Sequence, residues 1–267
     1  MRILATNDDG IYAPGLWCLV RALTQVGEVV VVAPDREQSG VGTSVTLHHP
    51  VRVRDIRSPV RRVRCYAIEG TPADSVILAL GVLLDDKVDL VVSGINEGPN
   101  LGSDVLISGT VSAALQGYLQ GIPSIAISVG AMENIHFDGA ARLAAVMARM
   151  IEAKALPREI LLNINLPNLP QDQIQGIEIT QLGHKSYGDE IKERHYGARR
   201  LFWIVRGRLE LEPEEGWELE EGTDIWALLR NRISITPLHS DLTSAAALST
   251  LKQLSNAIFQ DLGKPPE

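Results

Sequence analysis

The sequence predicts an α/β fold in which helices cover both faces of a doubly wound, mostly parallel sheet, giving three layers (α/β/α). Two observations carry this prediction. Runs such as residues 28–33 (EVVVVA) and 88–93 (VDLVVS) are short and rich in β-branched residues, which is typical of buried parallel strands. These runs alternate with segments whose apolar residues recur at helical spacing, as Leu16, Leu19 and Leu23 do.

The expected elements follow one another through the first two thirds of the chain. Strands of the sheet are expected at residues 2–6, 28–33, 88–93, 124–128 and 160–164. Helices are expected around residues 16–23, from 71 to about 84, and at 110–119 and 138–151. Thr71 is expected to cap the second of these helices, with Pro72 at its first position. The alternating segments 51–55 and 63–68 predict a small ribbon.

The pattern changes after about Leu166. Short strands are expected at residues 177–182, 200–206 and 232–236, an acidic solvated loop at 210–221, and an amphipathic helix at 245–259. We therefore expect a catalytic core at residues 1–166 and a β-rich C-terminal extension, with hairpin segments and a final helix, at residues 167–267. The extension has too little core of its own, and its final helix needs a partner face, so we expect it to serve oligomerisation.

The composition argues against several classes of protein. A formal net charge of −8 over 267 residues does not suit binding of duplex nucleic acid, which needs a basic surface. The N-terminal residues MRILATNDDG do not resemble a signal peptide, and no apolar run approaches the roughly 20 residues of a membrane span. Cys18 and Cys65 show neither metal-binding nor redox spacing. We expect a soluble, cytoplasmic protein that does not bind membranes.

The expected site lies in the loops beyond the carboxyl ends of the strands, where sheets of this kind bind their ligands. Asn7, Asp8, Asp9 and Gly10 follow the first strand directly. Two adjacent carboxylates repel each other unless a positive group binds there, and their hard oxygen atoms suit Mg²⁺, Mn²⁺ or Ca²⁺. The alternative is a solvated turn, because Asp and Gly are common in turns.

Two later loops bring further polar groups to the same edge. Ser39 and Gly40 follow the second strand and offer a hydroxyl and a main-chain N–H, although an ordinary polar loop is the alternative. Asn96 and Asn100 lie in a glycine-rich segment that is expected to form a loop over residues 94–109. A side-chain amide can give its oxygen to a metal ion or its N–H to a phosphate.

The following helix begins near Ser108, Gly109 and Thr110. Free N–H groups at the start of a helix bind anions, and this favours a phosphate site. The Thr110 hydroxyl is expected to act on phosphate and not on a metal ion. The alternative is that Ser108 or Thr110 is simply the N-cap of the helix, and both interpretations can hold together.

Several long segments carry a more specific signal, namely ATNDDGIYAPGL, VVAPDREQSGVGTSVTL, IEGTPADSV, VSGINEGPNLGSDVLISGTVSAALQG and SITPL. They resemble the SurE family, the survival-protein-E nucleotidases, from the first strand to about Leu238. The resemblance implies a Rossmann-like fold whose C-terminal extension is exchanged between the subunits of a homodimer or homotetramer. It also implies a divalent-metal-dependent phosphatase acting on nucleoside 5′- and 3′-monophosphates, and sometimes on short polyphosphate.

The resemblance further implies roles for individual residues. One divalent ion per subunit, Mg²⁺ or Mn²⁺, is expected. Its implied ligands are Asp8, Asp9, Ser39 and Asn96. The implied phosphate contacts are Asn7, Gly40, Asn96, Asn100, Ser108, Gly109 and Thr110. Asn7, Asp8 and Asp9 are the candidate catalytic groups, and the sequence does not assign the general base.

Two other functions remain open. In an aspartyl-phosphate phosphatase a second Asp lies two residues after the nucleophilic one, but here Gly10 occupies that place if Asp8 is the nucleophile. A phospho-accepting, Mg²⁺-binding signalling domain needs an Asp at the end of a central strand, where this sequence has Ser93. Tyr187 and Tyr196 lie in a polar segment and are expected at a rim or interface, with stacking on a nucleobase as the alternative.

Overall fold

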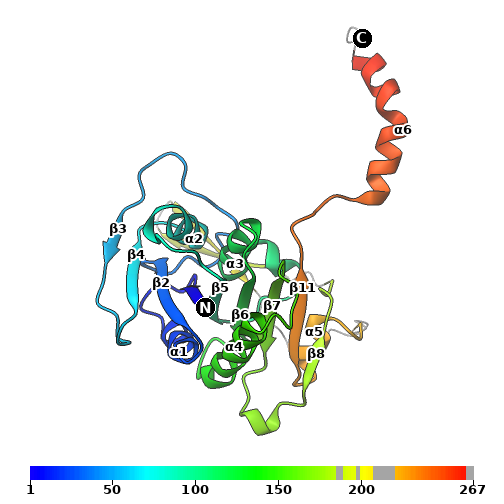
Figure 1. Ribbon diagram of the computed structural model, residues 1–267. Coiled ribbons are helices and arrows are strands. Elements are labelled where there is room, and N and C mark those ends of the chain that lie inside the picture. Colours follow the sequence, from blue (N-terminus) through cyan, green and yellow to red (C-terminus); the bar gives the residue numbers. More distant parts are fainter. Residues whose placement is uncertain (185–188, 197–198, 207–219, 263–267) are drawn as a thin grey trace.

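A single large sheet forms the centre of the fold (Figure 1), and the computed structural model describes residues 1–184, 189–196, 199–206 and 220–262. The sheet consists of β1 (Arg2–Thr6), β2 (Glu28–Pro34), β3 (Val53–Asp55), β4 (Arg64–Ile68), β5 (Leu90–Glu97), β6 (Ser124–Val129), β7 (Leu161–Leu166), β8 (Ile177–Ile179) and β11 (Ile233–Leu238). Within the described residues, β9 (Asp189–Tyr196) and β10 (Arg199–Arg206) pair only with each other, as an antiparallel hairpin.

The helices connect these strands and cover both faces of the sheet. They are α1 (Pro14–Leu23), α2 (Pro72–Leu78), α3 (Gly109–Leu119), α4 (Phe137–Glu152), α5 (Asp224–Leu229) and α6 (Ala245–Leu262). Shorter turns are a π-helical turn at Ala79–Leu83 and 3₁₀ turns at Gly102–Leu106 and Gln171–Gln173. No described helix is both long enough and apolar enough to span a membrane.

The strand order is β3-β4-β2-β1-β5-β6-β7-β11-β8. The six strands from β4 to β7 are all parallel, whereas β3 and β11 run antiparallel to β4 and β7 at the two sides. The order of these six strands is that of a doubly wound sheet, in which the chain reverses direction across the sheet between β1 and β5. Ligands of such sheets bind beyond the carboxyl ends of the two strands at this switch point. The predicted Rossmann-like α/β fold is therefore confirmed.

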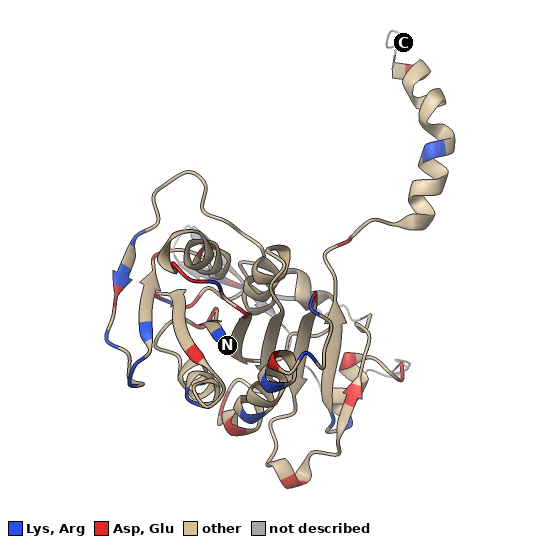
Figure 2. Cartoon of the chain, viewed as in Figure 1, with Lys and Arg blue, Asp and Glu red and all other residues tan. Residues whose placement is uncertain are grey.

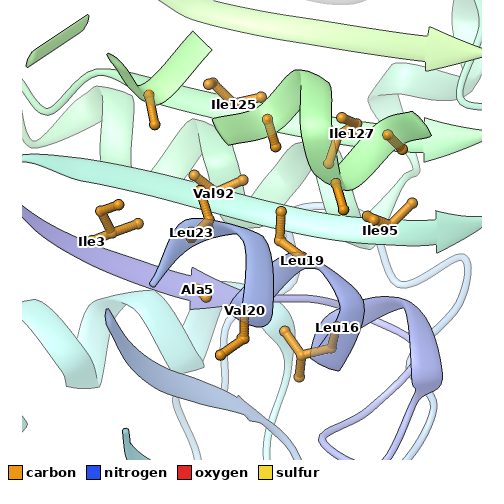
Figure 3. Packing of buried hydrophobic residues seen from close by; sticks show 14 of the residues in the cluster. Ile3, Ala5, Leu16, Leu19, Val20, Leu23, Val92, Ile95, Ile125 and Ile127 are labelled. Atoms are coloured by element: carbon orange, nitrogen blue, oxygen red, sulfur yellow. The ribbon is translucent and has the colours of Figure 1, made fainter. Parts of the chain in front are cut away.

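The main core lies between the sheet and the layer formed by α1 and α4. Figure 3 shows Leu16, Leu19 and Leu23 of α1 against the sheet, where the fully buried Ile3 and Val92 project from β1 and β5. A fully buried side chain of this size contributes roughly 1.5–3 kcal/mol. A second apolar layer lies on the other face of the sheet, beneath α2 and α3. The strand ends at the switch point are thus fixed from both sides.

The start of α2 shows how local sequence sets the loops around the site. Thr71 and Asp74 form a capping box, in which the Thr71 hydroxyl accepts from the Asp74 N–H and the Asp74 carboxylate accepts from the Thr71 N–H. The Asp74 carboxylate also accepts the N–H (2.9 Å) and the hydroxyl (2.6 Å) of Thr46. One side chain therefore begins a helix and anchors the long segment that follows β2.

Strand β5 extends further than the sequence predicted. The segment from Gly94 was expected to be a loop, but pairing with β6 continues to Glu97 across an irregularity between Gly94 and Asn96. A side chain at Gly94 would approach the Ile127 carbonyl oxygen to 2.3 Å, so glycine allows the two strands to stay paired. Asn96 is consequently held on a strand end rather than on a free loop.

The structure adds detail to two other expectations about strands. The segments expected to form a small ribbon do pair as β3 and β4, but β4 also pairs with β2 and is part of the main sheet. Beyond Leu166, β11 and β8 complete the same sheet on its other side. The core of the fold therefore includes residues from both sides of Leu166, and the division of the chain at that residue stays a prediction.

The last helix stands away from the rest of the molecule (Figure 1). The sequence predicted a helix at residues 245–259, and α6 extends over Ala245–Leu262 with every side chain exposed. Of the acidic run at 210–221, residues 210–219 lie outside the described residues, as does Tyr187. Tyr196 is the last residue of β9, and its side chain lies outside what the structure describes.

Candidate active site

Asp8 lies at the point where three segments meet, directly after β1. Its carbonyl oxygen accepts from the N–H of Gln38, at 2.7 Å, which brings the loop after β2 to it. Its carboxylate accepts the Thr110 hydroxyl from the first turn of α3. A side-chain carbon added at Gly109 would lie 2.7 Å from the Asp8 Cβ, so only glycine permits this close approach. Asp8 itself is 4% exposed.

The neighbouring carboxylate, that of Asp9, points to the end of β5. Its Oδ2 accepts from the Glu97 N–H at 3.3 Å. Burial raises the pKa of Asp9 to about 8, and the negative charge of Asp8 adds to the effect. Burial also raises the pKa of Asp8 to about 6, although the bonds from the hydroxyl and main chain of Thr110 lower it. Asp8, which is buried, and Asp9, which is half-buried, thus form an acidic pair at the switch point that a cation would stabilise.

The segment that follows β2 carries the exposed residues Ser39 and Gly40, directly after Gln38, whose N–H bonds to Asp8. The Ser39 hydroxyl donates to the Glu37 carboxylate at 2.8 Å. Gly40 has a φ of +74° and nothing within 4 Å of the position a side chain would take, so its backbone is open to approach by a ligand. The N–H of Gly42 donates to the carbonyl oxygen of Ile107 at 2.8 Å, which ties this segment to the turn before α3.

Asn7 and Asn96 lie at the ends of the two switch-point strands and are largely buried. The Asn7 side chain donates to the Gly10 carbonyl at 2.9 Å, and that of Asn96 donates to the Gly98 carbonyl at 2.7 Å. Each bond uses the amide nitrogen as the donor and does not involve the amide oxygen. Among the described residues the buried Oδ1 of Asn7 has no hydrogen-bond partner, which is typical of a place that a water or an ion completes.

The first turn of α3 begins at Ser108, which is the N-cap and accepts from the Val111 N–H at 3.1 Å. Thr110 is not the cap, because its hydroxyl donates to Asp8. The expectation that Thr110 acts on phosphate alone is therefore revised, since it holds a proposed metal ligand. The Asp8 carboxylate also lies at the positive end of the α3 helix dipole, a favourable place for an anion.

Asn100 occupies a different part of the same edge. Its hydrogen bonds go to β6 and β7, through Ser128, Asn163 and Asn165, rather than to the acidic pair. The structure therefore brings Asp8 into contact with Gly109 and Thr110, and Asp9 into contact with the end of β5. Ser39, Gly40 and Asn96 lie on the segments bonded to this pair, and Asn100 lies further along the loop after β5.

Two carboxylates near the site were not singled out from the sequence. The negative charges of Glu37 and Glu97 each help to raise the pKa of Asp9. Both stood inside recognised motifs, but nothing in the residue pattern shows which acids of a loop lie close enough to Asp9 to act on it. Figure 2 shows basic residues on β3 and β4, at one edge of the sheet, whereas Asp8 and Asp9 follow the central strand β1. The site is thus strongly acidic before any ligand binds.

The donor set fits a hard divalent cation. Asp8, Asp9, Ser39 and Asn96 offer carboxylate, hydroxyl and amide oxygens, which Mg²⁺ and Mn²⁺ prefer. Within the part of the chain that the structure describes, no group of three or more His, Cys, Asp or Glu side chains is arranged to hold a metal ion. A metal site here therefore depends on the hydroxyl and amide oxygens and on water, as is common for Mg²⁺.

Fold and site together define a Rossmann-like α/β protein with an acidic site and a helix N-terminus at the switch point of its sheet. Comparison with known proteins makes this specific. The model of the family described as survival protein SurE matches residues 3–189, and the chain belongs to this family.

Relatives match along nearly the whole chain. A 5′-nucleotidase SurE from Dehalococcoides mccartyi is 49% identical over 259 residues, covering 96% of this chain and 95% of that protein. A 5′-nucleotidase SurE from Geobacter sulfurreducens is 44% identical and covers 99% and 98%. The crystal structure of the SurE protein from Aquifex aeolicus has a TM-score of 0.79 and 41% identity, and covers 96% of this chain and 100% of that one.

Proposed function

We propose that this chain is a metal-dependent phosphatase that hydrolyses nucleoside 5′-monophosphates to nucleoside and phosphate. The observation that carries the proposal is the pair of the buried Asp8 and the half-buried Asp9 at the switch point, with the first turn of α3 bonded to Asp8. The names of the relatives support the choice of 5′-nucleotides. Action on 3′-monophosphates and short polyphosphate is proposed on the family resemblance.

The residues proposed to hold one divalent ion, Mg²⁺ or Mn²⁺, are Asp8, Asp9, Ser39 and Asn96. When bound, such an ion would supply positive charge that polarises a phosphate oxygen and lowers the pKa of water. Thr110 orients Asp8 through its hydroxyl, which keeps one carboxylate oxygen in a fixed direction. Without a cation, burial raises the pKa of Asp9 to about 8, so the charged form of the pair is unfavourable until a positive ion binds.

The phosphate group is proposed to bind between the metal ligands and α3. The N–H groups of Gly40 and Gly109, the Ser108 and Thr110 region and the Asn100 amide are the proposed donors to its oxygens, because a helix start and a left-handed glycine both expose main-chain N–H groups. The partnerless Oδ1 of Asn7 is the proposed acceptor for the attacking water. Proton transfer from that water is assigned to the Asn7–Asp9 segment without choosing a single base.

Two alternatives have less support. An aspartyl-phosphate enzyme with Asp8 as nucleophile would have Gly10 where its second acid belongs. A phospho-accepting domain would have Ser93, which is fully buried in β5, where its Asp belongs. Treatment with acetyl phosphate followed by mass analysis separates both from the proposal, since they predict a stable or trapped phosphoprotein and the proposal predicts none.

The proposed state of the enzyme is a cytoplasmic homodimer or homotetramer whose C-terminal segments are exchanged. Exposed apolar side chains support this, namely Leu201, Phe202 and Trp203 on β10 and Leu251, Leu254 and Phe259 on α6. Exposed apolar surface of this kind usually marks an interaction site. Both cysteines are free thiols, which suits a reducing compartment.

The experiment that tests the proposed function is phosphate release from a panel of substrates. The panel contains the four common nucleoside 5′-monophosphates, their 3′ isomers, tripolyphosphate and a non-nucleotide monoester, each with Mg²⁺ or Mn²⁺. We expect 5′-monophosphates to be among the best substrates. A preference for the non-nucleotide ester over every nucleotide would overturn the assignment to nucleotides.

A further inference from the structure

Strand β7 carries two asparagines where apolar residues are expected. Asn163 and Asn165 are both fully buried, and the residues that alternate with them, Leu162, Ile164 and Leu166, pack in the main core. The two amides therefore share the opposite face of the sheet, towards α3. Burying a side-chain amide is unfavourable unless its hydrogen bonds are satisfied, so their presence needs a specific partner.

The partner of both amides is the main chain of Asn100. The Asn165 side chain accepts from the Asn100 N–H at 2.8 Å and donates to the Asn100 carbonyl at 3.0 Å. The Asn163 side chain donates to the same carbonyl at 2.8 Å. The Asn163 amide oxygen has no partner in the described part of the chain, so this residue's one assigned bond is the donation to Asn100.

The side chain of Asn100 is held separately. Its amide nitrogen donates to the Ser128 hydroxyl oxygen at 2.9 Å, and Ser128 lies directly beside Asn165 on β6. This bond uses one N–H of the Asn100 amide and does not involve its second N–H or its oxygen. The backbone and the rotamer of one loop residue are thus fixed by three side chains from two neighbouring strands.

From this geometry we infer that Asn163, Asn165 and Ser128 are positioning residues that hold Asn100 ready to donate to the substrate phosphate. The inference rests on the proposed function, because it gives the Asn100 amide a phosphate to bind. Asn100 follows β5 outside any strand pairing. Gly98 and Gly102 on either side of it are bonded to Val129 and Asp224, and the main chain of Asn100 itself is held by the two amides of β7. A donor fixed in advance binds more tightly than one that must be ordered on binding.

A double-mutant cycle tests the inference. Asn165→Ala and Ser128→Ala are each made in the natural chain and in Asn100→Ala, which keeps the main-chain groups of residue 100. We expect each single change to lower kcat/KM for a nucleoside 5′-monophosphate by about tenfold to a hundredfold, the size of loss that a small misplacement produces. In the Asn100→Ala background the same changes should lower kcat/KM by less than about threefold, because the positioned amide is gone.

The matched control is Thr236→Val. Thr236 is buried opposite Asn163 on β11, and its hydroxyl bonds only to Thr180 and Ser234 among the described residues. This change should lower the melting temperature and leave kcat/KM unchanged. Losses of equal size in both Asn100 backgrounds, or a lower melting temperature with unchanged kcat/KM in Asn165→Ala and Ser128→Ala, would overturn the inference. Ser128→Ala leaves the bonds to the main chain intact, so it stays informative if Asn165→Ala does not fold.

Affinity for inorganic phosphate, measured by calorimetry with Mg²⁺ present, repeats the comparison without turnover. We expect the same pattern. Asn165→Ala should weaken the affinity for phosphate in the natural chain, and should not weaken it further in the Asn100→Ala background. If the natural chain hydrolyses nucleotides but the cycle is additive, only the inference fails. If the natural chain neither hydrolyses nucleotides nor binds phosphate, the proposed function fails and the inference with it.

Discussion

At the scale of single residues, the contact between Thr110 and Asp8 links the two halves of the proposed site. The Thr110 hydroxyl donates to the carboxylate of a proposed metal ligand from the first turn of the helix that is proposed to bind phosphate. Its sequence position indicated the helix, but not the direction in which the hydroxyl points. A side chain that orients a proposed metal ligand and lies in the proposed phosphate-binding turn should affect the binding of both, and this can be measured.

Thr110→Val keeps the shape of the side chain and removes the hydroxyl. A hydrogen bond to a charged group contributes roughly 1.5–3 kcal/mol, which corresponds to about tenfold to a hundredfold in kcat/KM. We expect a loss of that size together with weaker Mg²⁺ affinity measured without substrate, because Asp8 loses its orientation. Thr223→Val, which removes the N-cap of α5, is the control and should change stability alone. Unchanged metal affinity in Thr110→Val would contradict this role.

Asp9→Asn tests the electrostatics of the acidic pair. An acid whose pKa is raised to about 8 binds its proton more tightly in the folded protein than in the unfolded chain. The stability of the metal-free protein therefore falls as the pH rises from the ordinary value of 3.8 towards about 8. Asp9→Asn should reduce that fall, leave the metal-free protein at least as stable above pH 8, and weaken metal binding. If, at pH 8.5, the variant unfolds at a lower denaturant concentration than the natural chain, Asp9 is structural.

At the scale of the elements, most helices and strands were predictable because their signals are local. Capping by Thr71, the apolar face of α1 and the β-branched run of β2 each lie within a few neighbouring residues. The extension of β5 to Glu97 was not predictable, because a glycine and two polar residues carry no strand signal and the pairing depends on β6. The two asparagines of β7 were visible as polar residues in a buried run, but their partner is 63 and 65 residues away in the sequence.

The capping box of α2 gives a prediction about pH. Burial alone would raise the pKa of Asp74, but bonds from Thr46 and Thr71 outweigh it, and the pKa is lowered from 3.8. Its contribution to stability is therefore present above pH 3.8 and is lost as the pH falls through the lower pKa of the folded protein. Asp74→Ala should destabilise the protein by about 1–3 kcal/mol at pH 7, because buried donors lose a charged acceptor. Denaturant unfolding at pH 7 and pH 3 should show a smaller difference at pH 3, and an equal difference would contradict the assignment.

At the scale of the whole molecule, residues far apart in the chain are joined near the site. The Asp224 carboxylate, at the start of α5, accepts from the N–H groups of Gly102, Gly183 and Ile225. The loop after β5 is thereby tied to the segments that lead into the hairpin and to β11. Sequence reasoning found the change of pattern near Leu166 but could not show this contact. Nothing local marks a buried Asp that accepts from main-chain N–H groups of distant segments.

The assembly of the molecule is predicted from its exposed apolar side chains. α6 carries Leu251, Leu254 and Phe259, all exposed, on a helix that stands away from the sheet (Figure 1). Most of the stability of a helix in a protein comes from packing of its apolar face, so we expect this helix to need a partner. We expect a dimer or tetramer in light scattering at micromolar concentration, and removal of residues 240–267 should shift the protein to smaller species. A full-length monomer at that concentration would contradict the prediction.

The central claim, that Asp8 and Asp9 with Ser39 and Asn96 hold a divalent ion needed for phosphate release, is tested most directly by removing and restoring that ion. Phosphate release from a nucleoside 5′-monophosphate is measured in the full chain after treatment with chelator, and again after Mg²⁺ or Mn²⁺ is added back. We predict that activity is lost with chelator, returns with either ion, and does not return in Asp8→Asn. Full activity in the chelator-treated protein would contradict the account.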